Sequence, residues 1–318
     1  MKKRQFRFFF FALTMLIIFS PGCQPDADYP ELSLEPSENA DNNNGESELS
    51  QEDMSSPSPL RLAIAPVVSP PKTREYYQEL LTYLPEKLDR PIELELRSTY
   101  SEVNQLIEQG EVDAALICTW SYVELKDDGY IDLLVIPQIK GQTRYHSHII
   151  VPTGSPFAGL EDLHQEKFAF TDPLSFSGRL YVLSRLQQMN ETPGTFFQDY
   201  IFTYSHDNSV FAVAEGLVKA ASVDSLVYDY LVELDVSLGE KIMVIESSPP
   251  VGNPPLVVGA NIDPDLRQQL KDIFLTMHND EAGQKALAEM RVERFVEGAD
   301  KEYDYIRDIL ETKEGTTD

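Results

Sequence analysis

Short apolar runs alternate with segments of helical spacing along most of the chain. Residues 61–68 form a β-rich run, and apolar residues then recur at helical spacing from Tyr76 to Leu88. Residues 92–98 alternate strictly between apolar and polar positions, which is typical of a strand with one polar face. The pattern therefore predicts a strand, a helix and a second strand in succession.

The same alternation continues to residue 152. It predicts a helix at 100–109, a strand at 114–119, the start of a helix at 121–126, and strands at 133–139 and 148–152. Strands that alternate with helices indicate a mainly parallel α/β sheet, because parallel neighbours need a long crossover connection.

The rhythm then begins again, and it suggests a second α/β unit. Strands are predicted at 167–171, 201–204 and 220–223, helices at 177–189, 209–216 and near 226–234, returning strands at 241–246 and 256–258, and helices from Pro264 to the end. Two α/β lobes fit this order. Lobe 1 comprises residues 61–150 and 241–318, and lobe 2 comprises residues 151–240. Ligands of such folds bind in the crevice at the carboxyl ends of the strands.

The first 22 residues have the order of charge and hydropathy that marks an export signal. Three basic residues at 2–4 precede an apolar run at 8–19, which is shorter than the roughly 20 residues of a bilayer span. Gly22 before Cys23 resembles the lipobox of bacterial lipoproteins, in which the cysteine thiol receives a diacylglycerol. We therefore expect residues 1–22 to be a lipoprotein signal peptide and Cys23 to anchor the chain to a membrane of the cell envelope. The alternative is ordinary secretion with cleavage nearby.

Charge separates the next segment from the body of the chain. Residues 24–60 contain ten Asp or Glu and no Lys or Arg, and almost no aliphatic side chains. Such a segment cannot bury enough apolar surface to offset its ordering entropy, so residues 23–60 are expected to be a disordered acidic tether. The formal net charge of the whole chain is −27, which makes nucleic acid an unsuitable partner. With Cys23 lipidated, Cys118 has no disulfide partner.

Two segments carry candidate chemistry. In the first, Asp172 to Tyr181, a strand passes into a helix that Ser175 or Ser177 could cap. Unpaired backbone N–H groups at a helix start attract anions, and Gly178 permits close approach, so this segment could form an oxyanion socket. The alternative is a capped helix without a ligand.

The second segment begins at Tyr204 and contains the contiguous residues Ser205, His206 and Asp207. Adjacent residues on an extended chain point to opposite faces, so these three cannot relay a proton among themselves as a catalytic triad does. His206 at the carboxyl end of a strand is better placed to donate a hydrogen bond to an anion in the crevice. The alternative is a histidine in a surface loop.

Together the two segments resemble a known family. The pattern Asp172-Pro-x-Ser-x-Ser-Gly178, followed by Ser205-His-Asp-x-Ser-x-x-Ala-Val-x-x-Gly216, is similar to the phosphate/phosphite/phosphonate-binding proteins of ABC importers. Tyr100, Ser121-Tyr122 and Ser248–Pro255 are further landmarks, so the resemblance spans about residues 61–285. It implies a type II periplasmic binding protein, in which two α/β lobes with a hinge between them close on a tetrahedral oxyanion.

The resemblance also implies a set of ligand-binding residues. Residues 175–178 would form the oxyanion socket, His206 would donate to the same anion, and Asp224 would lie where substituents of the ligand are read. Two tyrosines would close over the anion, and a threonine at the end of the third strand would complete the site. The expected ligand-binding residues are Tyr100, Thr119, Tyr145, Ser175, Phe176, Ser177, Gly178, His206 and Asp224.

Two residues depart from the family pattern. Phe176 stands where relatives often have Thr, which removes a hydroxyl and keeps a backbone N–H. Cys118 stands where relatives often have Gly.

His146 and His148 lie two apart on a predicted strand and share a face, but no acid or cysteine is adjacent to them in the sequence. No metal and no cofactor are therefore expected.

Three functional classes follow from these features. The first, which we favour, is a monomeric, lipid-anchored solute-binding protein that captures a small oxyanion (phosphonate, phosphite or phosphate) for an ABC permease. The second is a sensor of the same fold that presents its ligand to a membrane histidine kinase, for which Cys118 would suit a thiophilic oxyanion such as arsenite. The third is a lipoprotein hydrolase. The sequence has no HExxH or GxSxG motif, so no enzymatic activity is expected.

Overall fold

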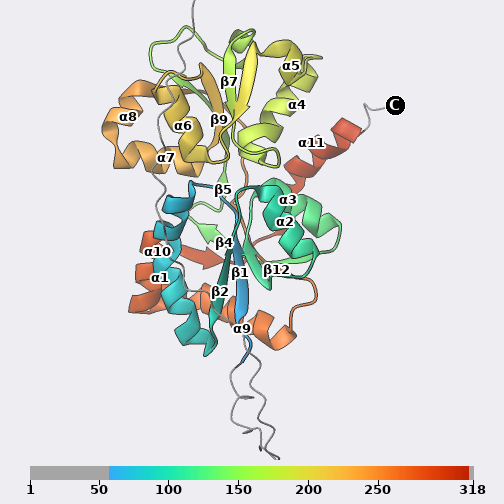
Figure 1. Cartoon of the computed structure of the whole chain (residues 1–318), viewed down its shortest axis with the longest axis vertical. Helices are drawn as coiled ribbons and strands as arrows, with labels where there is room; N and C mark the ends of the chain where they lie inside the picture. The colour runs from blue at the N-terminus through green and yellow to red at the C-terminus, as the bar shows by residue number, and fades with distance from the viewer. Residues whose placement is uncertain (1–56, 315–318) are drawn as a thin grey trace, which may run out of the picture. The chain divides into compact units, whose positions relative to one another are not determined.

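The computed structural model describes residues 57–314 (Figure 1). The predicted signal peptide, Cys23 and residues 24–56 of the predicted tether lie outside the described residues, whereas Leu60, which the prediction places in the tether, begins a strand and is fully buried. One sheet has six strands in the order β13-β4-β12-β3-β1-β2. β1 pairs in parallel with β2 and β3, whereas β12 lies antiparallel between β3 and β4, and β13 is antiparallel to β4. The strands are β1 (Leu60–Ile64), β2 (Ile92–Leu96), β3 (Ala114–Leu116), β4 (Ile131–Gln138), β12 (Leu256–Gly259) and β13 (Arg294–Val296).

Helices cover both faces of this first sheet because β1 is apolar on both of its faces. Leu60 and Leu62 pack in one cluster with α1 (Pro70–Leu88), α9 (Pro264–Thr276) and α10 (Glu281–Glu289). Ala63 points the other way, into a cluster with α2 (Tyr100–Glu108) and α3 (Thr119–Asp127). In Figure 1, α1 and α10 accordingly lie on one side of β1 and α2 and α3 on the other.

The second sheet has five strands in the order β10-β6-β9-β7-β8. β7 pairs in parallel with β8 and β9, while β6 is antiparallel to both β9 and β10. The strands are β6 (Ser147–Pro152), β7 (Lys167–Phe170), β8 (Asp199–Phe202), β9 (Ala220–Asp224) and β10 (Ile242–Ser247).

Two groups of helices cover the second sheet. A π-helical turn, η3 (Phe176–Leu180), continues into α4 (Tyr181–Gln188) and packs with α5 (Pro193–Phe196) on the face of the sheet that carries Phe168 and Phe170. The opposite face, which carries Ile150 and Ala169, packs against the remaining helices. These are α6 (His206–Ala214), α7 (Ser225–Leu234) and α8 (Val236–Lys241).

The two segments that pass between the sheets pair with each other. β5 (Arg144–Tyr145) and β11 (Val251–Gly252) form a short antiparallel ladder, in which Tyr145 lies opposite Val251. The C-terminal helix α11 (Asp304–Glu314) places Ile306 and Ile309 in the same apolar cluster as residues of both sheets. The crossing segments are thus held together, and Tyr145 lies where they meet.

The sequence predicted every strand of the two sheets except β13. The charged C-terminal region was expected to be helical throughout, and this is wrong for Arg294–Val296, which form a strand against β4. β6 and β10 both belong to the second sheet, so the chain passes between the two sheets before β6 and again after β10. The lobe boundaries at residues 150 and 240 stay a prediction.

Candidate functional site

The carboxyl ends of strands from both sheets approach each other at the first residue of α2. The backbone N–H of Tyr100 donates to Asp172 Oδ2 over 3.2 Å, so a loop of the second sheet bonds to a helix start of the first. The capping box of Thr99 and Glu102 fixes that helix start. Cys118, at the end of β3, donates its thiol hydrogen to the carbonyl oxygen of Leu174 over 3.0 Å. The predicted site residues lie around these contacts.

The turn at residues 175–178 is tightly packed. Ser175 Oγ accepts the backbone N–H of Gly178 over 2.9 Å, so Ser175 caps the helical turn as the sequence suggested. A Cβ atom on Gly178 would lie 2.4 Å from Cβ of Thr171. Glycine is therefore required here by the approach of the turn to β7, and this reason is independent of any ligand.

Two strands that are distant from Ser177 in the sequence fix its position. Its carbonyl oxygen accepts hydrogen bonds from the hydroxyls of Ser147, over 2.7 Å, and Ser222, over 2.5 Å. These two hydroxyls lie 3.0 Å apart, on the neighbouring strands β6 and β9. The turn is thus held to the middle of the second sheet by buried polar groups, which stabilises one geometry of residues 175–178.

Tyr145 is the centre of a buried hydroxyl cluster. Its hydroxyl lies 2.7 Å from Thr119 Oγ1, at the start of α3. Burial raises the pKa of Tyr145, and hydrogen bonds with Thr119 and Ser177 act in the opposite direction. Tyr145, Thr119 and Ser177 are 2 % exposed or less, so the cluster joins the two sheets away from bulk water.

The Tyr100 side chain adds a further hydroxyl to this region. It is 1 % exposed, and its hydroxyl has no hydrogen-bond partner among the residues that the structure describes. Burial raises the pKa of Tyr100 well above its usual range, and the nearby Cys118, Asp172, Asp224 and Tyr145 act in the same direction. The hydroxyl is therefore protonated, and a buried donor of this kind is expected to bind an acceptor.

The imidazole of His206 is neutral, and its tautomer is determined by its neighbours. Burial lowers the pKa of His206 to about 3. Nδ1 accepts the backbone N–H of Asp224 over 3.0 Å, and Thr171 Oγ1 lies 3.1 Å from the same nitrogen. Because Nδ1 accepts, the proton of the neutral ring is on Nε2, which can donate to an anion.

Asp224 ends β9 and caps α7. Its Oδ1 accepts the backbone N–H groups of Leu226, over 2.7 Å, and Val227, over 3.4 Å. Burial raises the pKa of Asp224 to about 7, although these two bonds act in the opposite direction. Near neutral pH the carboxyl is thus partly protonated, and in that form it can donate a hydrogen bond instead of repelling an anion.

The Phe176 side chain belongs to the apolar core. It is fully buried, and its ring centroid lies 6.2 Å from those of Tyr145 and Tyr305, in edge-to-face geometry with both. Residue 176 could therefore contribute to an anion site through its backbone N–H, as the substitution of the family's Thr suggested.

Ser205, His206 and Asp207 act separately. Ser205 is the N-cap residue of α6. Asp207 accepts two hydrogen bonds from Ser69, which follows β1 of the first sheet: the Ser69 N–H donates to Oδ1 over 3.0 Å and the Ser69 hydroxyl donates to Oδ2 over 2.6 Å. His206 also bonds across the sheets, because its N–H donates to the carbonyl oxygen of Val67 over 3.0 Å. The three side chains therefore do not form a triad.

His146 and His148 stack with their ring centroids 6.0 Å apart. His146 Nδ1 is 2.7 Å from the carbonyl oxygen of Ser248, and burial lowers the pKa of His148 to about 4. Among residues 57–314 no group of three or more His, Cys, Asp or Glu is arranged to hold a metal ion. The Cys118 thiol, whose pKa burial raises to about 12, is protonated and so is a poor ligand for a thiophilic ion.

Sequence reasoning missed Ser147, Thr171 and Ser222 as parts of the site. All three are fully buried in or next to strands that are otherwise apolar. A serine or threonine at an inward position of a buried strand needs a partner, and that requirement was the available signal.

Comparison with known proteins identifies the family. Residues 62–303 match the family described as the periplasmic substrate-binding protein of phosphonate ABC transporters. The chain belongs to this family. A relative in Mycolicibacterium smegmatis, the phosphate-import protein PhnD, is 26 % identical over 232 residues, which cover 69 % of this chain and 71 % of the relative.

Two solved structures share the fold of this family member. The binding protein component of an ABC phosphonate transporter from Pseudomonas aeruginosa has a TM-score of 0.74 at 22 % identity, covering 81 % of this chain and 87 % of that protein. PhnD1 from Prochlorococcus marinus, solved with methylphosphonate, has a TM-score of 0.71 at 17 % identity, covering 80 % of this chain and 98 % of that protein. These likenesses confirm the predicted two-lobed type II fold.

Family membership also confirms that this chain is a substrate-binding protein of the periplasmic type and not an enzyme. Within the part of the chain that the structure covers, no helix combines the length and the hydropathy needed to cross a bilayer.

Proposed function

We propose that this family member captures a small tetrahedral oxyanion (phosphonate, phosphite or phosphate) and delivers it to an ABC permease in the membrane. The observation that carries the proposal is the neutral, Nε2-protonated His206 in the same buried region as the Tyr100 hydroxyl and the cluster of Tyr145, Thr119 and Ser177. Uncharged donors from both sheets suit a ligand that accepts hydrogen bonds in several directions.

Hydrogen bonds to a charged ligand are strong enough for this function. Each contributes about 1.5–3 kcal/mol, so four of them contribute about 6–12 kcal/mol, a range that includes the roughly 8 kcal/mol of micromolar binding, before the costs of association. The net charge of −27 is no obstacle, because exposed charges beyond about 8 Å are largely screened at physiological salt.

Closure of two lobes would complete the site. The paired crossing segments β5 and β11 support a hinge near the predicted boundaries at residues 150 and 240. Contacts from His206 to Val67 and from Asp207 to Ser69 cross between the lobes and would stabilise the closed form. Ligand binding should then compact the protein and raise its melting temperature.

The proposal includes a membrane anchor. The basic, apolar and Gly22-Cys23 sequence supports lipidation at Cys23, with residues 24–60 as a spacer. Cys23→Ser should then release the protein from membranes into the soluble fraction of the envelope. A wild-type protein that is already soluble would contradict the anchor and leave the binding function intact.

Calorimetry of the full-length chain tests the binding function. We expect one of phosphate, phosphite and methylphosphonate to bind, and His206→Ala and Ser177→Ala each to weaken that binding by about 1–3 kcal/mol, the cost of stranding a buried partner. His164→Ala is the matched control, since His164 packs on Phe196 outside the hydroxyl cluster. Arsenite belongs in the same panel: binding of arsenite alone would favour the sensor over the transporter.

A further inference from the structure

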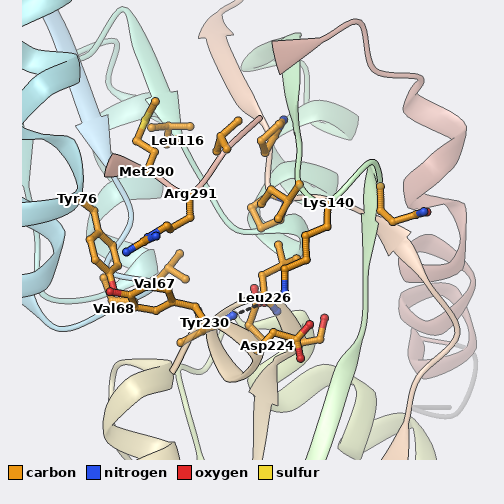
Figure 2. A pocket seen from close by; sticks show the side chains of 18 of the residues that line it. Val67, Val68, Tyr76, Leu116, Lys140, Asp224, Leu226, Tyr230, Met290 and Arg291 are labelled. Carbon is orange, nitrogen blue, oxygen red and sulfur yellow. Dashed lines mark hydrogen bonds between the residues drawn. The ribbon is translucent and has the colours of Figure 1, made fainter. Parts of the chain in front are cut away.

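A large cavity lies beside the candidate anion site, between the two sheets (Figure 2). Its volume is about 1010 Å³. Tyr76 of α1, Leu116 of β3 and Met290 at the end of α10 form the wall on the side of the first sheet. Leu226 and Tyr230, both on α7, form the wall on the side of the second sheet, as Figure 2 shows.

Asp224 connects this cavity to the anion site. Asp224 lines the cavity, and its backbone N–H donates to Nδ1 of His206. Its Oδ1 accepts the N–H of Leu226, which also lines the cavity. Asp224 therefore belongs both to the cavity wall and to the predicted anion site.

The cavity wall offers apolar surface, and two of its cationic side chains have partners within the protein. Lys140 forms an ion pair with Glu233. The guanidinium of Arg291 lies over the ring of Tyr230, 5.3 Å from its centroid. The aliphatic part of the wall is made by residues from both sheets, among them Val67, Val68, Leu116, Leu226, Val227 and Met290.

The volume decides what kind of group fits. Pockets that enclose most of a drug-sized ligand measure about 300–1,000 Å³, and this cavity is at the upper end of that range. Inorganic phosphate, phosphite and methylphosphonate are small, with about five heavy atoms or fewer. Each would leave nearly all of the apolar wall in contact with water.

We propose that the cavity holds the organic substituent of the ligand, so that the preferred substrates are phosphonates or phosphate monoesters with a long alkyl or an aryl group. The inference rests on the proposed oxyanion function and specifies its substrate class. The anionic group binds at His206 and the hydroxyl cluster, and the substituent passes Asp224 and packs between Leu226 of one sheet and Met290 of the other.

Tyr76 adds a polar feature to this substrate class. Its hydroxyl is buried in the cavity wall and has Tyr230 as a polar neighbour. The ring packs edge to face on Tyr230, with centroids 5.3 Å apart. A substituent that carries one acceptor, such as an ether oxygen, could accept a hydrogen bond from this hydroxyl, and Tyr76→Phe should remove any preference for it.

A series of ligands with the same anionic group tests the proposal. The full-length protein is titrated with methylphosphonate, n-hexylphosphonate and phenylphosphonate at one pH and one salt concentration. We expect the hexyl and phenyl compounds to bind at least tenfold more tightly than methylphosphonate, because their apolar surface leaves water. Equal or weaker binding of the larger compounds overturns the inference and leaves the proposed function standing, whereas no binding of any phosphonate overturns both.

A variant that fills the cavity locates the effect. Met290→Trp should weaken binding of hexylphosphonate at least tenfold and leave methylphosphonate binding unchanged. Leu217→Trp is the matched control, since Leu217 is 70 % exposed and lies outside the cavity lining. Both melting temperatures are measured to show that the variants fold. If Met290→Trp folds and binds both phosphonates as the wild type does, the substituent is bound elsewhere and the inference is wrong.

Discussion

The backbone N–H of Asp224 donates a hydrogen bond to Nδ1 of His206 over 3.0 Å. This contact joins the end of β9 to the start of α6 and determines which nitrogen of the ring carries the proton. It also shows why a histidine suits this position, because a neutral imidazole accepts with one nitrogen while it donates with the other.

The first prediction concerns the charge of His206. Its pKa is lowered by burial to about 3, so the ring should be neutral and protonated on Nε2 from pH 5 to pH 8. Nitrogen NMR of labelled histidines measures this, with the His206 signal assigned by its loss in His206→Gln. A titration of that signal near the ordinary histidine pKa of about 6.5 would contradict the lowered pKa, and nitrogen shifts of a ring protonated on Nδ1 would contradict the tautomer.

The same pKa has a consequence for stability. A histidine whose pKa is depressed in the folded state stabilises the fold above its unfolded pKa, and the contribution is lost as the pH falls from about 6.5 toward 3. Burial of His148, which lowers its pKa to about 4, acts in the same direction. The unfolding free energy should therefore decrease below pH 6.

The second prediction concerns Asp224, for which the sign is reversed. Its folded pKa of about 7 is above the unfolded value, so its neutral form favours the fold, and that advantage is lost as the pH rises through 7. Asp224→Asn keeps a capping oxygen and removes the charge. It should raise the unfolding free energy at pH 8 by on the order of a few kcal/mol and by little at pH 4, at about 1.36 kcal/mol for each pKa unit.

Asp235→Asn is the matched control for that variant. Asp235 also caps a helix, but it is exposed, and a hydrogen bond from Ser237 lowers its pKa. Its replacement should not stabilise the protein at pH 8. Equal effects of the two variants in thermal unfolding at pH 8 would show that the burial of Asp224 has no role.

The third prediction concerns the contact between Asp207 and Ser69. Because both oxygens of Asp207 accept from Ser69 across the two sheets, Asp207→Ala should favour the open form and weaken ligand binding by about 1–3 kcal/mol. Small-angle scattering should show less compaction at the same ligand concentration. Asp199→Ala is the control, since Asp199 bonds to the N–H of its neighbour Tyr200 on β8. Unchanged affinity of Asp207→Ala would mean that this contact does not stabilise closure.

The fourth prediction concerns Gly178. Gly178→Ala places a Cβ atom 2.4 Å from Cβ of Thr171, so the turn must shift and the protein should lose about 1–3 kcal/mol of stability, as overpacked cores do. Gly194→Ala, whose Cβ would have no heavy atom within 4 Å, should leave the denaturant midpoint nearly unchanged. Similar denaturant midpoints for the two variants would contradict the close packing of Gly178 against Thr171.

How far the sequence determined the structure depends on how local each signal was. The strictly alternating residues 92–98 predicted β2, and the helical spacing from Tyr76 to Leu88 predicted α1. β13 was missed because Arg294–Val296 lie in a charged region and gain their strand conformation from pairing with β4, more than 150 residues earlier. Long-range pairing of this kind leaves no local pattern.

In the candidate site, too, the residues with a local sequence signal were predicted and those placed by long-range contacts were not. His206 and Ser177 were found because each lies in a local motif where a strand passes into a helix. Their support was not found, since Ser147 and Ser222 come from strands that only the folded sheet brings to the carbonyl of Ser177. The Phe176 ring likewise packs against Tyr305, a partner that no sequence pattern indicated.

The most direct test of the central claim is a crystal structure of the full-length protein with methylphosphonate. We expect a phosphonate oxygen within hydrogen-bond distance of Nε2 of His206 and another near the hydroxyl of Tyr100, with the Asp224 N–H still bonded to Nδ1. A phosphonate bound away from His206, or a His206 ring turned so that Nδ1 faces the ligand, would contradict it.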